Sequence, residues 1–207
     1  FENFLKKGQF ILGRDVENFE KKISKYIKKK FTVGVSSGTN AIYLALRALN
    51  IKKNDHILVP CLSWLSTFTA TERTGAIPIG VDINDDLSIN IESLKKRFTK
   101  KTKALLLVHF SGLVSQMDNI KKFCNKKKIK LIEDGAQAFG TVYKNRPTGS
   151  FGDLACFSMN PMKVFSSIGD AGTVSTNDKF LYNKIKALRY AGTVNKEYAI
   201  YSELNHK

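Results

Sequence analysis

The residues with the clearest capacity for chemistry are Asp134 and Lys163. Asp134 ends an apolar stretch, and Lys163 closes the largely apolar segment 156–163, CFSMNPMK. A carboxylate can serve as counter-ion to a ring nitrogen, and an amine can form a Schiff base with an aldehyde. An amine held among apolar side chains has a lowered pKa, because desolvation disfavours its charged form, and only the neutral amine attacks an aldehyde. The pair indicates a site for pyridoxal phosphate.

Such a cofactor also needs a group that holds its phosphate. Residues 36–40, SSGTN, lie where a strand pattern ends and a helix pattern begins. The free backbone N–H groups, the helix dipole and the Thr39 hydroxyl at such a junction can hold a phosphate dianion. The same residue types also serve as ordinary turn and cap residues. The glycine-rich patterns of dinucleotide and nucleoside triphosphate sites are missing.

Two more residues are placed to contact a bound ring. Gln137 follows Asp134 by three positions and could donate a hydrogen bond to a ring oxygen if the chain turns helical there. Trp64, the only tryptophan, follows another strand pattern, and its indole could stack on the ring. The alternatives are a solvated loop glutamine and a core tryptophan.

These residues are positioned by an alternation of helix and strand patterns. Helical spacing of apolar residues predicts helices at 15–30, 39–50, 63–74, 91–98, 117–127 and 178–190. Short apolar runs predict strands at 31–35, 56–59, 76–83, 104–109, 129–133, 155–158 and 172–175. This order predicts an α/β fold with a mostly parallel sheet flanked by helices. Ligands of such sheets bind beyond the carboxyl ends of the strands.

Composition excludes several other classes. The 207 residues, 43% hydrophobic, can bury one sizeable core, and no apolar run is long enough to cross a membrane. The chain opens with Phe1 and shows no signal segment, so we expect a cytoplasmic location. Its three cysteines have no paired spacing, so we expect reduced thiols and no metal site. The net charge of +16 comes mainly from scattered lysines, which predicts a basic surface able to attract an anionic substrate. Because no nucleic-acid motif accompanies these lysines, we expect no specific nucleic-acid partner.

In combination, the motifs resemble those of the DegT/DnrJ/EryC1/StrS family of sugar aminotransferases, from about residue 8 to the C-terminal end. The matching motifs come in the family's order: VSSGT at 35–39, VP at 59–60 leading to Trp64, VH at 108–109, EDGAQA at 133–138, GSFGD at 149–153 and CFS at 156–158 leading to Lys163.

The resemblance implies a role for each matching residue. Lys163 matches the Schiff-base lysine, Asp134 the carboxylate under the pyridine nitrogen, and Gln137 the glutamine beside the phenolic oxygen. The phosphate-holding positions are Gly38, Thr39 and Ser158, and Trp64 falls where the family places an aromatic ring over the cofactor. His109 also matches a recurrent position, without an assigned role.

The family further implies an aspartate aminotransferase-like fold, called fold type I, with a seven-stranded sheet in its large domain. Its members are homodimers with shared active sites. They move an amino group from an amino acid, usually L-glutamate, to a nucleotide-linked keto sugar in amino-sugar and surface polysaccharide biosynthesis. We expect an N-terminal arm and helix at 1–30, the cofactor-binding large domain at 31–190, and the start of a largely missing small domain at 191–207.

Two departures leave alternatives open. Ala171 stands in the turn at 169–172 where family members commonly have glycine, which could crowd the turn. The chain also has roughly half the length of a family member. A related sugar dehydratase is one alternative, although those enzymes have histidine where this chain has Lys163. A catalytically silent fragment of the same fold is the other.

Overall fold

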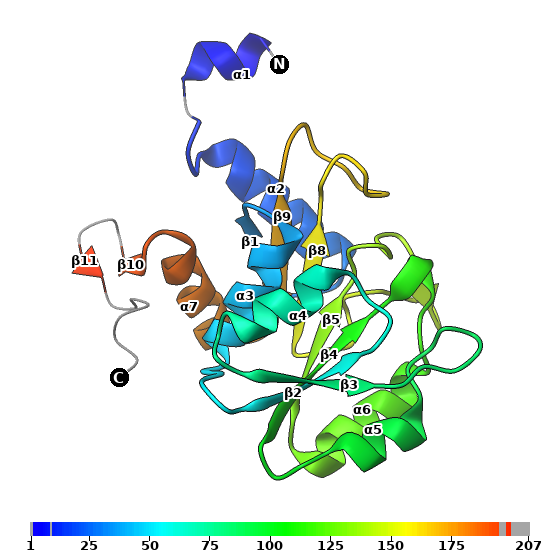
Figure 1. Ribbon diagram of the computed structural model, residues 1–207. Helices are drawn as coiled ribbons and strands as arrows, with labels where there is room; N and C mark the ends of the chain where they lie inside the picture. Colours follow the sequence, from blue (N-terminus) through cyan, green and yellow to red (C-terminus); the bar gives the residue numbers. More distant parts are fainter. Residues whose placement is uncertain (1, 9, 195–197, 200–207) are drawn as a thin grey trace.

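A seven-stranded sheet with helices on both faces forms the centre of the chain in the computed structural model, which describes residues 2–8, 10–194 and 198–199 (Figure 1). The strand order is β1-β9-β8-β5-β4-β2-β3. The strands are β1 (Phe31–Val35), β2 (His56–Pro60), β3 (Ile77–Val81), β4 (Thr102–Val108), β5 (Lys130–Asp134), β8 (Leu154–Ser158) and β9 (Gly172–Thr176).

The expected mostly parallel sheet is confirmed. The strands β3, β2, β4, β5 and β8 are parallel to their neighbours, whereas β9 runs antiparallel to both β8 and β1. The parallel strands therefore present their carboxyl ends at one edge, as the helix and strand alternation predicts.

The helices are α1 (Glu2–Lys7), α2 (Arg14–Tyr26), α3 (Gly38–Ala48), α4 (Leu65–Glu72), α5 (Ile91–Arg97), α6 (Met117–Lys127) and α7 (Lys179–Arg189). The side chains of consecutive β8 residues point to opposite faces of the sheet. Leu154 and Cys156 pack with the apolar side chains of α3 and α7. Ala155 and Phe157 pack on the opposite face, against Ile23 and the neighbouring Ile27. The helices α5 and α6 cover that second face beside β3 and β5.

One expected helix is shorter than its apolar spacing suggested. The pattern predicted a helix over 15–30, but α2 ends at Tyr26. Lys28 has φ +56°, a left-handed conformation that stops a helix, and the backbone N–H of Lys29 bonds back to Ser24. Ile27 still packs in the core, so the apolar pattern extends one residue beyond the end of the helix.

Several small elements complete the described chain. They are the 3-10 turn η1 (Phe110–Gly112), the hairpin of β6 (Val142–Tyr143) and β7 (Arg146–Pro147), and the pair β10 (Thr193–Val194) and β11 (Tyr198–Ala199). Within the described residues, no helix is both long and apolar enough to cross a membrane. Most of the expected segment at 191–207 lies outside the described residues.

Candidate active site

A cavity of about 490 Å³ lies at the carboxyl ends of β4, β5 and β8, beside the first turn of α3. The seven residues predicted from the sequence all line it. They are Gly38, Thr39, Trp64, Asp134, Gln137, Ser158 and Lys163. The chain therefore brings together residues from four separate stretches of sequence at the edge where ligands of parallel sheets bind.

The first turn of α3 forms one wall of the cavity. Ser37 is the N-cap, and its Oγ accepts the backbone N–H of Asn40 at 3.1 Å. The hydroxyl of Thr39 donates to Ser66 Oγ at 2.8 Å. Gly38 has no room for a side chain, because a β-carbon there would come within 2.5 Å of Ser158 Cβ. The positive end of the α3 dipole is thus open to the cavity, which favours an anion.

Asp134 forms the floor of the cavity and is only 7% exposed. Its Oδ1 accepts the backbone N–H of Ala136 at 3.0 Å. Burial raises the pKa of this carboxyl, while the Ala136 hydrogen bond and the charges of His109 and Lys163 act in the opposite direction without cancelling the rise. A cationic group bound above Asp134 would favour its ionised form further.

Gln137 reaches the cavity from a turn, so the helical geometry considered for it does not occur. The backbone N–H of Ala138 bonds to Gly135 at 2.8 Å, which closes the turn. The Gln137 side chain accepts the N–H of Ser111 through Oε1 at 2.8 Å. Its amide nitrogen remains a donor on the cavity side of this contact.

Lys163 lies in the loop between β8 and β9, and its backbone N–H donates to Asn160 at 2.8 Å. The apolar enclosure expected from its neighbours is wrong. Met162 and Val164 are 92% and 80% exposed, and Lys163 itself is half-buried. The chain turns at 160–163, and the side chains of Met162 and Val164 face outward, so sequence proximity to apolar residues does not desolvate the amine.

Trp64 is the N-cap residue of α4 and is 71% exposed, so the interpretation as a core tryptophan is wrong. Ala171 has no positive φ, so its place in the turn does not require the backbone conformation that favours glycine. The carbonyl of Ala171 accepts the backbone N–H of Met159 at 2.8 Å, and this bond anchors the turn after the Lys163 loop.

The sequence interpretation missed several lining residues, of which Asn160 and Asp170 are the most polar. Asn160 Nδ2 donates to Asp170 Oδ1 at 2.9 Å, and Asn160 Oδ1 accepts the N–H of Met162 at 3.0 Å. These contacts join the two ends of the Lys163 loop. Neither residue stands in a strand or helix pattern, and only the folded loop reveals the pair.

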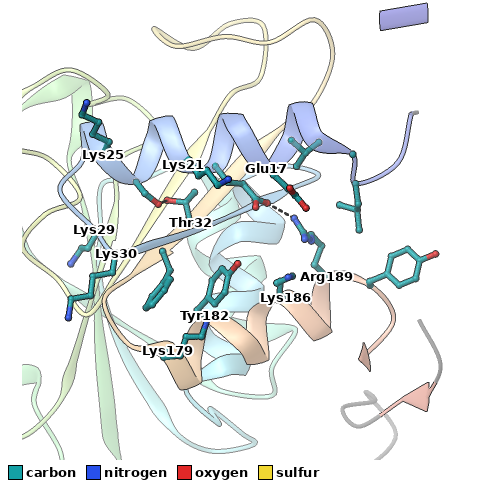
Figure 2. A pocket seen from close by; sticks show the side chains of 17 residues that line it. Glu17, Lys21, Lys25, Lys29, Lys30, Thr32, Lys179, Tyr182, Lys186 and Arg189 are labelled. Atoms are coloured by element: carbon teal, nitrogen blue, oxygen red, sulfur yellow. Dashed lines mark hydrogen bonds and ion pairs between the residues drawn. The ribbon is translucent and has the colours of Figure 1, made fainter. Parts of the chain in front are cut away.

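A second cavity, of about 730 Å³, lies between α2, β1 and α7 (Figure 2). Its charged wall includes Lys21, Lys25, Lys30, Lys179 and Lys186. Figure 2 also shows the ion pair between Arg189 and Glu20, at 2.6 Å. None of the seven predicted residues lines this larger cavity, so cavity size does not identify the site.

Within the described residues, no group of three or more His, Cys, Asp or Glu side chains is placed to hold a metal ion.

Known proteins are similar to the chain in both sequence and fold. The chain is 36% identical over 207 residues to the dTDP-3-amino-3,6-dideoxy-alpha-D-galactopyranose transaminase of Aneurinibacillus thermoaerophilus, covering 98% of this chain and 56% of the relative. The structure of S. venezuelae DesV in complex with a ketimine intermediate superimposes with a TM-score of 0.94 at 33% identity, covering 97% of this chain and 54% of that one.

A solved dehydratase is similar as well. The structure of GDP-4-keto-6-deoxymannose-3-dehydratase with a trapped PLP-glutamate geminal diamine has a TM-score of 0.87 at 32% identity, covering 92% of this chain and 51% of that one. The chain thus spans about half the length of the proteins it matches. The family model described as DegT/DnrJ/EryC1/StrS aminotransferase matches residues 1–205. The chain belongs to the DegT/DnrJ/EryC1/StrS aminotransferase family.

Proposed function

We propose that the chain is the cofactor-binding part of a pyridoxal phosphate-dependent aminotransferase acting on a nucleotide-linked keto sugar. The observation that carries the proposal is the single cavity lined by all seven residues selected from the sequence. We assign the cofactor-binding domain to 31–190, preceded by an arm and helix at 1–30 and followed at 191–207 by the start of a further region.

The residues of the cavity fit this cofactor. Gly38, Thr39 and Ser158 would hold the phosphate, because the missing side chain of Gly38 leaves backbone and hydroxyl groups accessible at the positive end of α3. Asp134 would hold the pyridine nitrogen and Gln137 the phenolic oxygen. Trp64 would cover one face of the ring.

When bound, pyridoxal phosphate withdraws electrons from the α-carbon of the amino compound attached to it. The buried Asp134 carboxylate would lie against the ring nitrogen and favour its protonated form. The Lys163 amine would attach the cofactor when no substrate is bound and, when free, would move a proton at the α-carbon of the substrate. Gln137 and the α3 turn would fix the orientation of the ring.

The two substrates are an amino acid, which we take to be L-glutamate, and a keto sugar carried on a nucleotide. The named relative from Aneurinibacillus acts on a dTDP-linked amino sugar, which supports this class. A net charge of +16 would raise the local concentration of a diphosphate-bearing substrate by long-range attraction. We place the enzyme in the cytoplasm, in amino-sugar and surface polysaccharide biosynthesis.

We further propose that a second copy of the chain covers the mouth of the cavity. Apolar side chains next to the site are strongly exposed, and such surfaces mark interaction sites. The most exposed are Trp64 at 71%, Leu65 at 69%, Met162 at 92%, Val164 at 80% and Ile168 at 98%. A homodimer with shared active sites would bury them.

Lysine at position 163 favours amino transfer over dehydration, the activity named for one structural neighbour. The related dehydratases carry histidine where this chain has Lys163. An amine is a nucleophile toward an aldehyde, whereas an imidazole forms no stable adduct there.

The test is to mix the purified chain with pyridoxal phosphate, record its absorbance and trap any adduct with borohydride. The chain is rich in lysine, so the modified peptide must be identified by mass spectrometry. We expect the trapped adduct on Lys163, its loss in Lys163→Ala, and an unchanged adduct in Lys186→Ala, whose lysine lines the second cavity. A folded wild-type chain without an adduct on Lys163 would favour the silent fragment.

A further inference from the structure

Behind the floor of the active-site cavity lies a completely buried pair, Glu133 and His109. His109 Nε2 lies 3.1 Å from Glu133 Oε2, and neither side chain is exposed. Glu133 also accepts backbone N–H groups from Gly149 at 2.9 Å, Phe151 at 2.7 Å and Gly152 at 2.6 Å. Four donors therefore surround one carboxyl group, which makes it a fixed buried anion.

The electrostatics agree with this arrangement. Burial by itself raises the pKa of the Glu133 carboxyl, but the hydrogen bond and charge of His109, with the N–H groups of Gly152 and Gly149, hold the pKa below its usual value. Lys29 adds to the support, because its buried ammonium donates to the carbonyl of Gly152 in the turn that holds Glu133.

This pair is connected to the cofactor site through the backbone. Glu133 and Asp134 are consecutive residues at the end of β5, so their side chains point to opposite faces of the sheet. The backbone N–H of His109 donates to the Asp134 carbonyl at 3.0 Å. Val108, next to His109, lines the cavity together with Asp134. Any movement of the pair would therefore move Asp134.

The charged surroundings of Asp134 are few. The groups whose electrostatics are coupled to Asp134 are His109, directly after β4, Lys163, in the loop after β8, and the Cys156 thiol of β8. Asp134 raises the pKa of Cys156 further above the value that burial alone produces, so this thiol stays neutral. Of these groups, Lys163 is assigned to the reaction and the Cys156 thiol is neutral, so His109 is the buried group whose charge can act on Asp134.

The ring of His109 depends on a single side-chain contact. Its Nδ1 is buried and has no hydrogen-bond partner within the described part of the chain. Glu133 alone therefore decides how the ring is turned. The charge of His109 in turn lowers the pKa of the Asp134 carboxyl.

We propose that His109, held by Glu133, is a positioning residue for Asp134: it anchors the strand end and supplies the positive charge that keeps the carboxylate ionised against the cofactor's ring nitrogen. This inference rests on the proposed function, since it assigns Asp134 to that nitrogen. Neither residue touches the cofactor cavity, and both act through Asp134.

The test separates the charge of His109 from its hydrogen bond. In His109→Gln, the side-chain amide can still donate to Glu133 but carries no charge. Ser150→Ala is the matched control, because Ser150 Oγ lies buried in the same turn and has no hydrogen-bond partner among the described residues. The carboxyl carbon resonance of Asp134, assigned with Asp134→Asn, is followed against pH in the cofactor-free chain. Cofactor affinity is measured separately.

We expect Asp134 to titrate at higher pH in His109→Gln than in the wild type, with Ser150→Ala unchanged. Cofactor binding should weaken roughly tenfold in His109→Gln, the scale of one lost interaction with a charged group. A lower unfolding temperature with an unchanged Asp134 titration would make His109 purely structural and overturn the proposal.

If His109→Gln does not fold, the wild-type titration decides. The ring resonances of His109 and the carboxyl resonance of Asp134 must then change over the same pH range, and independent changes overturn the proposal. These measurements need no bound cofactor. A wild-type chain that forms no adduct on Lys163 would contradict the proposed function and leave the result on the pair standing.

Discussion

Gly38, at the start of α3, and Ser158, at the end of β8, touch so closely that no side chain fits between them. A β-carbon on Gly38 would lie 2.5 Å from Ser158 Cβ and 3.1 Å from Ser158 Cα. Real β-carbons do not come as close as 2.5 Å to another atom, and the tight 3.1 Å contact is with the backbone, which cannot swing away. This contact brings the dipole of α3 and the end of the sheet to the same point of the cavity.

Gly38→Ala should therefore destabilise the chain even though alanine favours helices. We expect a loss of about 1–3 kcal/mol, the range for overpacking, together with weaker binding of pyridoxal phosphate. Gly34→Ala, in β1, is the control, since its nearest new contact would be an ordinary 3.5 Å. Urea unfolding and cofactor titration of both variants measure the effect. Equal stability of the two variants would contradict the close contact.

Asp134 should reduce the stability of the cofactor-free chain at neutral pH. Burial raises its folded-state pKa above the usual 3.8, so the folded chain binds this proton more tightly than the unfolded chain. The free energy of unfolding then falls as pH rises from the unfolded pKa through the folded pKa. Asp134→Asn removes this fall.

We expect cofactor-free Asp134→Asn to exceed the wild type by on the order of 1 kcal/mol at neutral pH and to match it in acid, below both pKa values. Urea unfolding at a series of pH values measures the difference, with the exposed Asp85→Asn as control. The same variant should bind pyridoxal phosphate poorly. A pH-independent difference from the wild type would argue against a buried, titrating carboxyl.

Trp64 should affect the cofactor and not the fold. Because the side chain is 71% exposed, Trp64→Ala should change the free energy of unfolding by no more than about 0.5 kcal/mol. Cofactor binding should weaken in this variant, whereas Val142→Ala, exposed at 57% and outside both the cavity lining and the proposed interface, should bind normally. As the single tryptophan, Trp64 should also lose fluorescence when the ring binds. Equal affinities in the two variants would remove Trp64 from the site.

Local patterns were sufficient for the elements of the sheet, and together with the family resemblance they identified seven of the residues that line the cavity. Each strand of the central sheet lies within a few residues of its predicted range, because two-residue and 3.6-residue periodicities are local properties of the chain. The seven residues converge because most follow strand ends or begin helices, and parallel strands share one carboxyl edge.

Other features depended on contacts between distant segments. The apolar letters around Lys163 suggested an enclosed amine, yet Met162 and Val164 point outward. Spacing could not reveal whether a loop residue faces the core, because a loop has no fixed period. The end of α2 depended likewise on the left-handed turn at Lys28.

The sequence by itself determined the alternation of elements, the order of the motifs and the identities of the groups that can do chemistry, because each is written in neighbouring residues. Tertiary structure alone decided that β9 runs antiparallel between β1 and β8, that Gly38 meets Ser158, and that His109 is enclosed against Glu133. Those features arise from strand order and burial. Burial also sets the electrostatics of Asp134, since the loss of water around a carboxyl depends on every segment that packs over it.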